Sequence, residues 1–125
     1  MILVIDDFIK DKGLLKEISQ DTNFFNDPGI YYWWDGWWNG EAKTVKHRLI
    51  EAIWADNCPL TQPMSIRGFE YWTGIQTANT ETGFSNNLGN HYDKDEELFA
   101  KTGEIVIPSM GTVYYPEQDK FEGGM

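Results

Sequence analysis

His91 and Asp93 stand two positions apart and carry side chains that can bind one metal ion together. On a β-strand, residues i and i+2 emerge on the same face, with Cα atoms about 7 Å apart. A third ligand would complete the site of two histidines and one carboxylate that holds non-haem Fe(II) with open positions. The alternative is a surface histidine beside acids in a loop, because a chain with 20 acidic residues brings such pairs together easily by chance.

Two further motifs follow this pair along the chain. After His91-Tyr92-Asp93 come Thr-Val-Tyr-Tyr at 112–115 and Glu-Gly-Gly at 122–124. This order resembles that of Fe(II)/2-oxoglutarate-dependent oxygenases of the prolyl-4-hydroxylase-like branch, especially its versions from marine bacteria and their phages. The resemblance covers residues 69–125. Residues 1–60 match only loosely, as the strand and helices that such domains carry ahead of the barrel.

The resemblance implies a site and a reaction. His91 and Asp93 would be ligands of Fe(II), while Tyr92 between them would point the other way and pack. Tyr71 and Tyr115 are candidate contacts to the cosubstrate 2-oxoglutarate, although alternation lets only one of Tyr114 and Tyr115 face inward. The reaction would be oxidative decarboxylation of 2-oxoglutarate to succinate, coupled to hydroxylation of a C–H bond in a small-molecule or peptide substrate.

Part of the family's site is not found in these 125 residues. The distal histidine ligand and the Arg or Lys that pairs with 2-oxoglutarate follow the Gly-Gly turn in the family, and here only Met125 follows Gly124. The other histidine, His47, falls opposite the apolar stripe on a helical wheel, so we expect it to be exposed. We therefore expect the N-terminal portion of an oxygenase, inactive alone.

The elements that must position these residues indicate an α+β fold in a single domain, residues 1–125. We expect helices in a part spanning 1–60, packed on an antiparallel sheet in 61–125 that forms the first part of a double-stranded β-helix, or jelly roll, and is incomplete. Alternation of apolar and polar residues and helical periodicity distinguish the two kinds of element. The expected helical segments are 11–21, 41–54 and 95–101. The expected strands are 2–5, 69–75, 105–107 and 112–115.

An aromatic run at residues 31–38 is the second unusual feature. It contains four tryptophans, namely Trp33, Trp34, Trp37 and Trp38. Exposed, they can stack on sugars or on substrate rings; packed, they can join the helices to the sheet. They also support an alternative function, that of a non-catalytic binding or assembly protein with a jelly-roll-like fold and an aromatic surface for carbohydrate or protein.

Composition and charge restrict the partners. The net charge of −10 argues against nucleic acid or an anionic membrane, since both require a basic surface. No apolar run approaches the roughly 20 residues of a membrane helix. Cys58 is the only cysteine, which excludes an intrachain disulfide. We expect a cytoplasmic protein, and a homo-oligomer that covers the open edge of the sheet.

Overall fold

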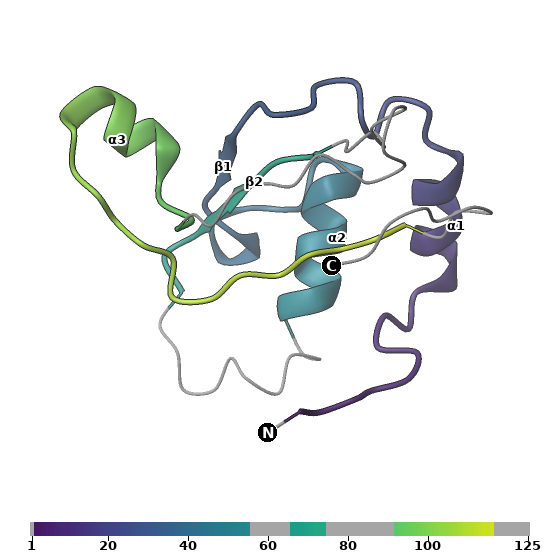
Figure 1. The fold of residues 1–125 in the computed structure, drawn as a ribbon. Coiled ribbons are helices and arrows are strands. Elements are labelled where there is room, and N and C mark those ends of the chain that lie inside the picture. Colours follow the sequence, from purple (N-terminus) through teal and green to yellow (C-terminus); the bar gives the residue numbers. More distant parts are fainter. Residues whose placement is uncertain (1, 56–65, 75–91, 117–125) are drawn as a thin grey trace, which may run out of the picture.

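The computed structural model describes residues 2–55, 66–74 and 92–116. Over these residues the chain is a small α+β protein in which helices flank a two-stranded antiparallel sheet (Figure 1). The elements in chain order are α1 (Lys12–Gln20), β1 (Tyr32–Trp34), the 3-10 helix η1 (Trp37–Asn39), α2 (Val45–Trp54), β2 (Phe69–Tyr71) and α3 (Glu96–Thr102). The predicted α+β class is confirmed at this level.

Side-chain caps determine where α1 and α2 begin. The Asp11 carboxylate accepts a hydrogen bond from the Leu14 amide at 2.9 Å. The Thr44 hydroxyl accepts one from the His47 amide at 3.1 Å. Each cap satisfies an amide that the first helical turn leaves unpaired. The helix expected at 11–21 is confirmed as α1, whereas the helix expected from residue 41 begins only at Val45, because Thr44 is extended.

The short helix α3 follows the predicted pattern closely. Asp95 caps its start by accepting from the Leu98 amide at 2.8 Å. Gly103 ends it with a φ of 71°, a left-handed conformation that glycine adopts without a steric penalty. Acids in the first turn and Lys101 in the last complement the helix dipole. The helical turn predicted at 95–101 is thus confirmed.

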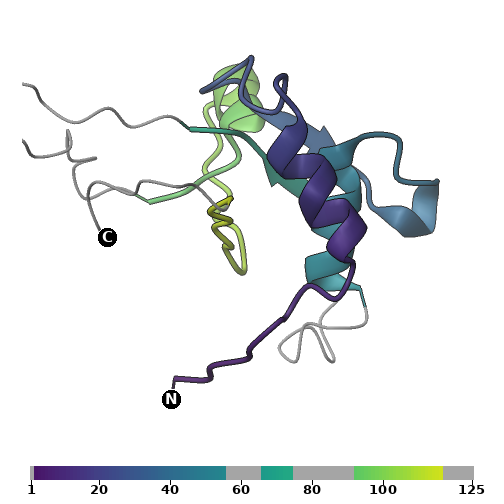
Figure 2. The same ribbon diagram turned by 90° about the vertical axis from the view of Figure 1, so that its right-hand side faces the viewer.

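The hydrophobic core lies between α1 and α2, which run side by side (Figures 1 and 2). Its buried residues are Leu14, Ile18, Phe24 and Leu49. Tyr114, far along the chain, also packs against this cluster. On the surface, Arg48 donates two hydrogen bonds to the Glu17 carboxylate, at 2.9 and 2.6 Å, and so links the two helices.

The strands β1 and β2 form a ribbon whose register pairs Tyr32 with Tyr71, Trp33 with Glu70 and Trp34 with Phe69. Residues in the aromatic run therefore form a strand that is not among the expected ones. The strand expected at 69–75 is confirmed only from Phe69 to Tyr71, because residues 72–74 are not in a strand. Residues 75–91 lie outside the described part.

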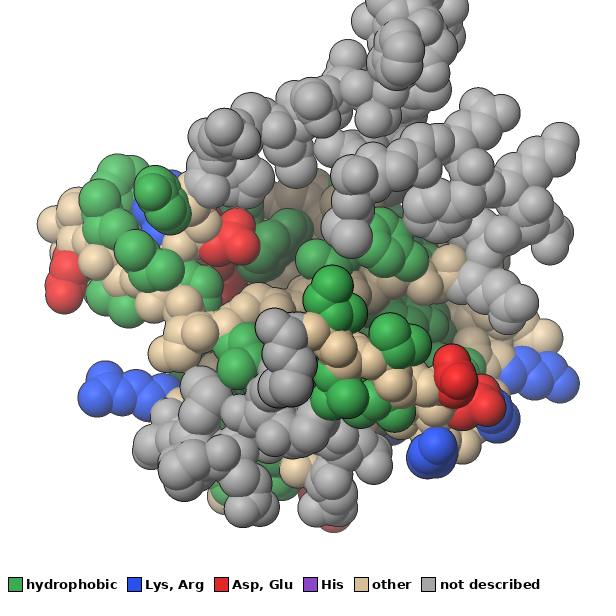
Figure 3. Space-filling model, turned by 60° about the horizontal axis from the view of Figure 1, so that its bottom comes forward, with side chains coloured by type: hydrophobic (Ala, Val, Ile, Leu, Met, Phe, Trp, Pro, Cys, Tyr) green, Lys and Arg blue, Asp and Glu red, His purple; other side chains and the backbone are tan. Residues whose placement is uncertain are grey.

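Three expected strands are not strands in the structure: residues 2–5, 105–107 and 112–115. Most of their apolar side chains are exposed instead, such as Ile2 at 93% and Val113 at 72%, whereas Tyr114 packs against the core. Figure 3 shows many hydrophobic side chains on the lower face of the molecule. A strand needs a neighbour to pair with its backbone, and the described residues provide only the β1–β2 pair. The apolar pattern alone was therefore insufficient to predict these three strands. The further strands of a jelly roll are not seen within the described residues.

Candidate functional site

The two faces of the β1–β2 ribbon pack against different helices. Alternation places Tyr32, Trp34, Phe69 and Tyr71 on one face. This inner face meets α2, because Trp34 stacks on His47 and Phe69 contacts Trp54. The outer face carries Trp33 and Glu70, and it is directed toward α3, whose Glu96 amide bonds to Glu70. The two faces make two distinct candidate sites.

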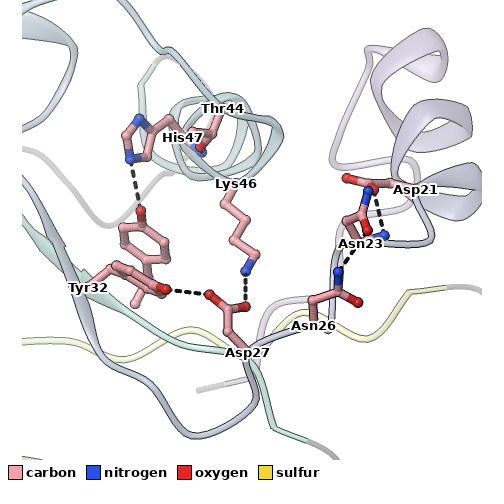
Figure 4. Close-up of polar contacts among 9 residues, drawn as sticks. Asp21, Asn23, Asn26, Asp27, Tyr32, Thr44, Lys46 and His47 are labelled. Carbon is pink, nitrogen blue, oxygen red and sulfur yellow. Dashed lines mark hydrogen bonds and ion pairs between the residues drawn. The ribbon is translucent and has the colours of Figure 1, made fainter.

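His47 lies in the aromatic cluster of the inner face. Its ring is parallel to that of Trp34, with centroids 4.5 Å apart and an interplanar angle of 4°. Its Nε2 lies 3.0 Å from the Tyr71 hydroxyl oxygen (Figure 4). Burial disfavours the charged imidazolium and lowers the pKa of His47, and the nearby Lys43 ammonium lowers it further. The expectation that His47 points away from the core into solvent is wrong, because α2 packs against the ribbon as well as against α1.

Asp27 joins the loop after α1 to the ribbon and to α2. Its carboxylate accepts hydrogen bonds from the Tyr32 hydroxyl at 2.5 Å and from Lys46 Nζ at 3.1 Å (Figure 4). These two hydrogen bonds lower the pKa of Asp27, and the bond from Tyr32 has the larger effect. The same contact raises the pKa of Tyr32, since ionised Tyr32 would face a carboxylate. The hydrogen bond to Asp27 thus holds Tyr32, which lies at the edge of the inner aromatic cluster.

Tyr71 and Tyr115, the candidate 2-oxoglutarate contacts, lie in different environments. Tyr71 is partly buried, stacks on Tyr32 with centroids 5.6 Å apart, and has its hydroxyl beside His47. Burial raises its pKa, and so does the Asp27 charge. Tyr115 is half exposed, whereas its neighbour Tyr114 packs against the core. Of the two, therefore, Tyr114 is the one that faces inward.

The outer face of the ribbon and α3 enclose a shallow pocket of about 260 Å³. Glu70 joins its two sides, because its carboxylate accepts a hydrogen bond from the Glu96 amide at 3.2 Å. Burial raises the pKa of Glu70, as do the nearby charges of Asp95, Glu96 and Asp93, while the Glu96 amide opposes the shift. The residues lining the pocket are Tyr31, Tyr32, Trp33, Glu70, Asp95, Glu97, Leu98 and Lys101.

Trp33 is held in place at this pocket. Its indole Nε1 donates to the Asp35 carboxylate at 2.7 Å. Its ring lies against Gly68, where a Cβ atom would come within 2.3 Å of Trp33 Cζ2. Gly68 therefore gives the indole the space it occupies.

The four tryptophans proposed as a substrate surface divide into two groups. Trp34 is buried, and Trp37 is partly buried with its ring stacked on Phe69 at 5.7 Å. Trp33 and Trp38 are half exposed. Packing between helix and sheet thus explains Trp34 and Trp37, while Trp33 and Trp38 are open to contacts.

Of the two predicted iron ligands, only Asp93 belongs to the described residues; His91 lies outside them. The Asp93 residue is exposed in the segment that leads into α3, close enough to Glu70 for its charge to raise the pKa of that residue. Tyr92 is 83% exposed, so the expectation that it packs is wrong. Within residues 2–55, 66–74 and 92–116, no group of three or more His, Cys, Asp or Glu side chains is placed to hold a metal ion.

Comparison of the chain with protein-family models, with curated proteins and with solved structures finds no match. In the part of the chain that the structure describes, no helix has the length and apolar character needed to cross a membrane.

The sequence reasoning missed two functional candidates, His47 and Glu70. For Glu70 a signal existed: it is an acid within an alternating strand whose other outward residue, Trp72, is aromatic. A charged residue at such a position is typical of a strand face that meets polar groups. For His47, a helical wheel represents only one packing partner of the helix and leaves out the ribbon, against which His47 packs.

Proposed function

We propose that this chain carries the first part of the iron site of an Fe(II)/2-oxoglutarate oxygenase of the prolyl-4-hydroxylase-like branch. The observation that carries the proposal is the order of His91-x-Asp93, Thr112–Tyr115 and Glu-Gly-Gly at 122–124. One imidazole and one carboxylate are a donor set that suits Fe(II). When bound, the iron would supply the oxidative chemistry.

Under this proposal the chain's own residues position the metal and its surroundings. Asp93, exposed and two residues before the Asp95 cap of α3, would be one ligand, and His91 the other. The β1–β2 ribbon would belong to a jelly roll. The substrate would be a small molecule or a peptide.

Metal binding tests the proposal directly. Mn(II), which replaces Fe(II) without oxidising, is titrated into the protein and followed by the loss of the free-ion signal in electron paramagnetic resonance. We expect weak binding that His91→Ala and Asp93→Ala each abolish. Glu104→Gln is the matched control, because Glu104 is an exposed acid away from the motif. Equal binding by the wild type and both variants would refute the ligand assignment.

The coding sequence beyond codon 125 provides a second, independent test. An oxygenase requires a further histidine and, a few residues later, an Arg or Lys. We expect the reading frame to continue and to encode both. A stop codon at position 126 would contradict the proposal.

The ribbon also supports a proposal about assembly. Strand edges with unpaired backbone groups favour pairing with another chain, and exposed apolar side chains at 2–5 and 105–107 add surface to bury. We propose a homo-oligomer that covers them. Light scattering at micromolar concentration is expected to give at least a dimer, and a clean monomer would contradict this.

A second candidate function is a non-catalytic binding protein, favoured by the half-exposed Trp33 at a pocket beside α3. Such a protein would bind its ligand equally well after His91→Ala and Asp93→Ala. Its binding would instead be sensitive to replacement of Trp33.

A further inference from the structure

The pocket between the ribbon and α3 is small and open to solvent. At about 260 Å³ it lies below the roughly 300–1,000 Å³ of pockets that hold drug-sized ligands. It therefore suits a single head group. Its sides are fixed to each other, because Glu70 on β2 bonds to the α3 backbone and Asp95 caps the same helix.

One wall of the pocket is aromatic. Tyr31 and Trp33 line it, and 42% and 47% of their surfaces are exposed. Tyr31 also contacts Trp72, with ring centroids 5.1 Å apart. Trp33 is fixed by its hydrogen bond to Asp35 and by its contact with Gly68. A fixed aromatic face attracts cations through the negative potential above the ring.

The charged residues of the pocket are mostly acidic. Three carboxylates, those of Glu70, Asp95 and Glu97, line it together with one ammonium, that of Lys101. The balance is 3 negative charges against 1 positive charge, a net charge of −2. Lys101 forms an ion pair with Glu97, so it neutralises one of the three. Anionic ligands are therefore disfavoured and cationic ones attracted.

The arrangement also favours an organic cation over a metal ion. The described carboxylates do not form a group of three that could hold a metal ion. Carboxylates spread around an aromatic wall match a cation whose charge is diffuse and whose surface is apolar.

We propose that the pocket formed by Tyr31, Trp33, Glu70 and α3 binds an organic ammonium ion, with its alkyl groups on Trp33 and its charge beside Glu70. The ligand class is that of quaternary ammonium compounds. This inference deepens the second candidate function and does not depend on iron binding, so the two fail separately.

Choline is a suitable probe, and dimethylbutanol, its uncharged isostere with carbon in place of nitrogen, is the control ligand. Each is titrated into the isotope-labelled 125-residue chain at constant ionic strength, while the Trp33 indole N–H resonance is followed by NMR. Loss of this resonance in Trp33→Phe assigns it. We expect saturable shifts with choline, with a dissociation constant on the order of millimolar, and no saturation with dimethylbutanol.

Matched variants test the residues. Trp33→Leu is expected to weaken choline binding about three- to tenfold, as measured by saturation transfer to the choline methyl groups. Trp38→Leu should leave it unchanged, because Trp38 is similarly exposed but outside the pocket. Glu70→Gln should weaken binding, and Glu104→Gln, which removes the same charge elsewhere, should not.

Several results would overturn the proposal. Equal binding of dimethylbutanol would mean that the site is merely apolar. Equal losses in Glu70→Gln and Glu104→Gln would mean that choline responds only to the net charge. Absence of a saturable shift in the wild type would exclude the site, and this readout involves no variant that could fail to fold.

Discussion

Gly68 is the position where one added methyl group tests the packing of the ribbon most directly. In Gly68→Ala the new Cβ would lie 2.3 and 2.7 Å from two atoms of the Trp33 ring and 2.9 Å from the Trp34 carbonyl oxygen. Carbon atoms in contact prefer about 3.5–4.0 Å, so the ring must move by about 1 Å or more. Overpacking of this kind costs about 1–3 kcal/mol.

The expected loss can be measured by urea denaturation. With a slope of about 2 kcal/mol per M for a small protein, a loss of about 2 kcal/mol lowers the midpoint by about 1 M. Gly74→Ala is the matched control, because no atom lies within 4 Å of its Cβ position. That variant should remain within about 0.5 kcal/mol of the wild type.

A double-mutant cycle separates the ring from the backbone contact. In a Trp33→Ala background the ring clash disappears while the contact to the Trp34 carbonyl remains, so Gly68→Ala should become milder by about 1 kcal/mol. An undiminished cost in that background would refute the role assigned to Trp33. A loss in Gly68→Ala no larger than that in Gly74→Ala would refute the packing argument itself.

Three further predictions concern pH and capping. The pKa of His47 in the folded state lies below its ordinary value, so the unfolded chain binds the proton more readily. The free energy of unfolding should therefore fall as the pH drops below about 6.5. This fall should be smaller in His47→Phe than in the control variant His91→Gln. The pKa of Glu70 is raised, so its ionisation opposes folding. Glu70→Gln should therefore increase the thermal midpoint at pH 7, and this gain should vanish toward pH 4. A difference in thermal midpoint that does not change with pH would contradict the burial of this carboxylate. Thr44→Ala removes the cap of α2 and should cost about 0.5–2 kcal/mol in chemical denaturation, while Thr44→Ser, which keeps the hydroxyl, should cost little.

The helices were predictable because their signals are local. Leu14 and Ile18 lie one turn apart on α1 and are both buried. Asp95 and Gly103 are a typical start and end for α3. The alternation from Phe69 also placed Phe69 and Tyr71 on the inner face and Glu70 on the outer one.

The remaining features depend on partners far away in the sequence. The aromatic run has no alternation of polar and apolar residues, so β1 is defined only by its pairing with β2. The position of His47 depends on the ribbon that covers α2, which a helical wheel does not represent. The exposed segment 2–5 has the composition of a strand, yet composition does not provide a neighbouring strand.

Tyr114 has a consequence for how the protein folds during synthesis. It covers a core whose other members, Leu14 through Leu49, belong to the first part of the chain. Helices α1 and α2 are complete at Trp54, and 114 − 54 = 60 further residues must be added before Tyr114 exists. At about 5–20 residues per second, translation takes roughly 3–12 s over that stretch. During those seconds one side of the nascent core stays uncovered, and a chaperone that binds exposed apolar surface can bind there.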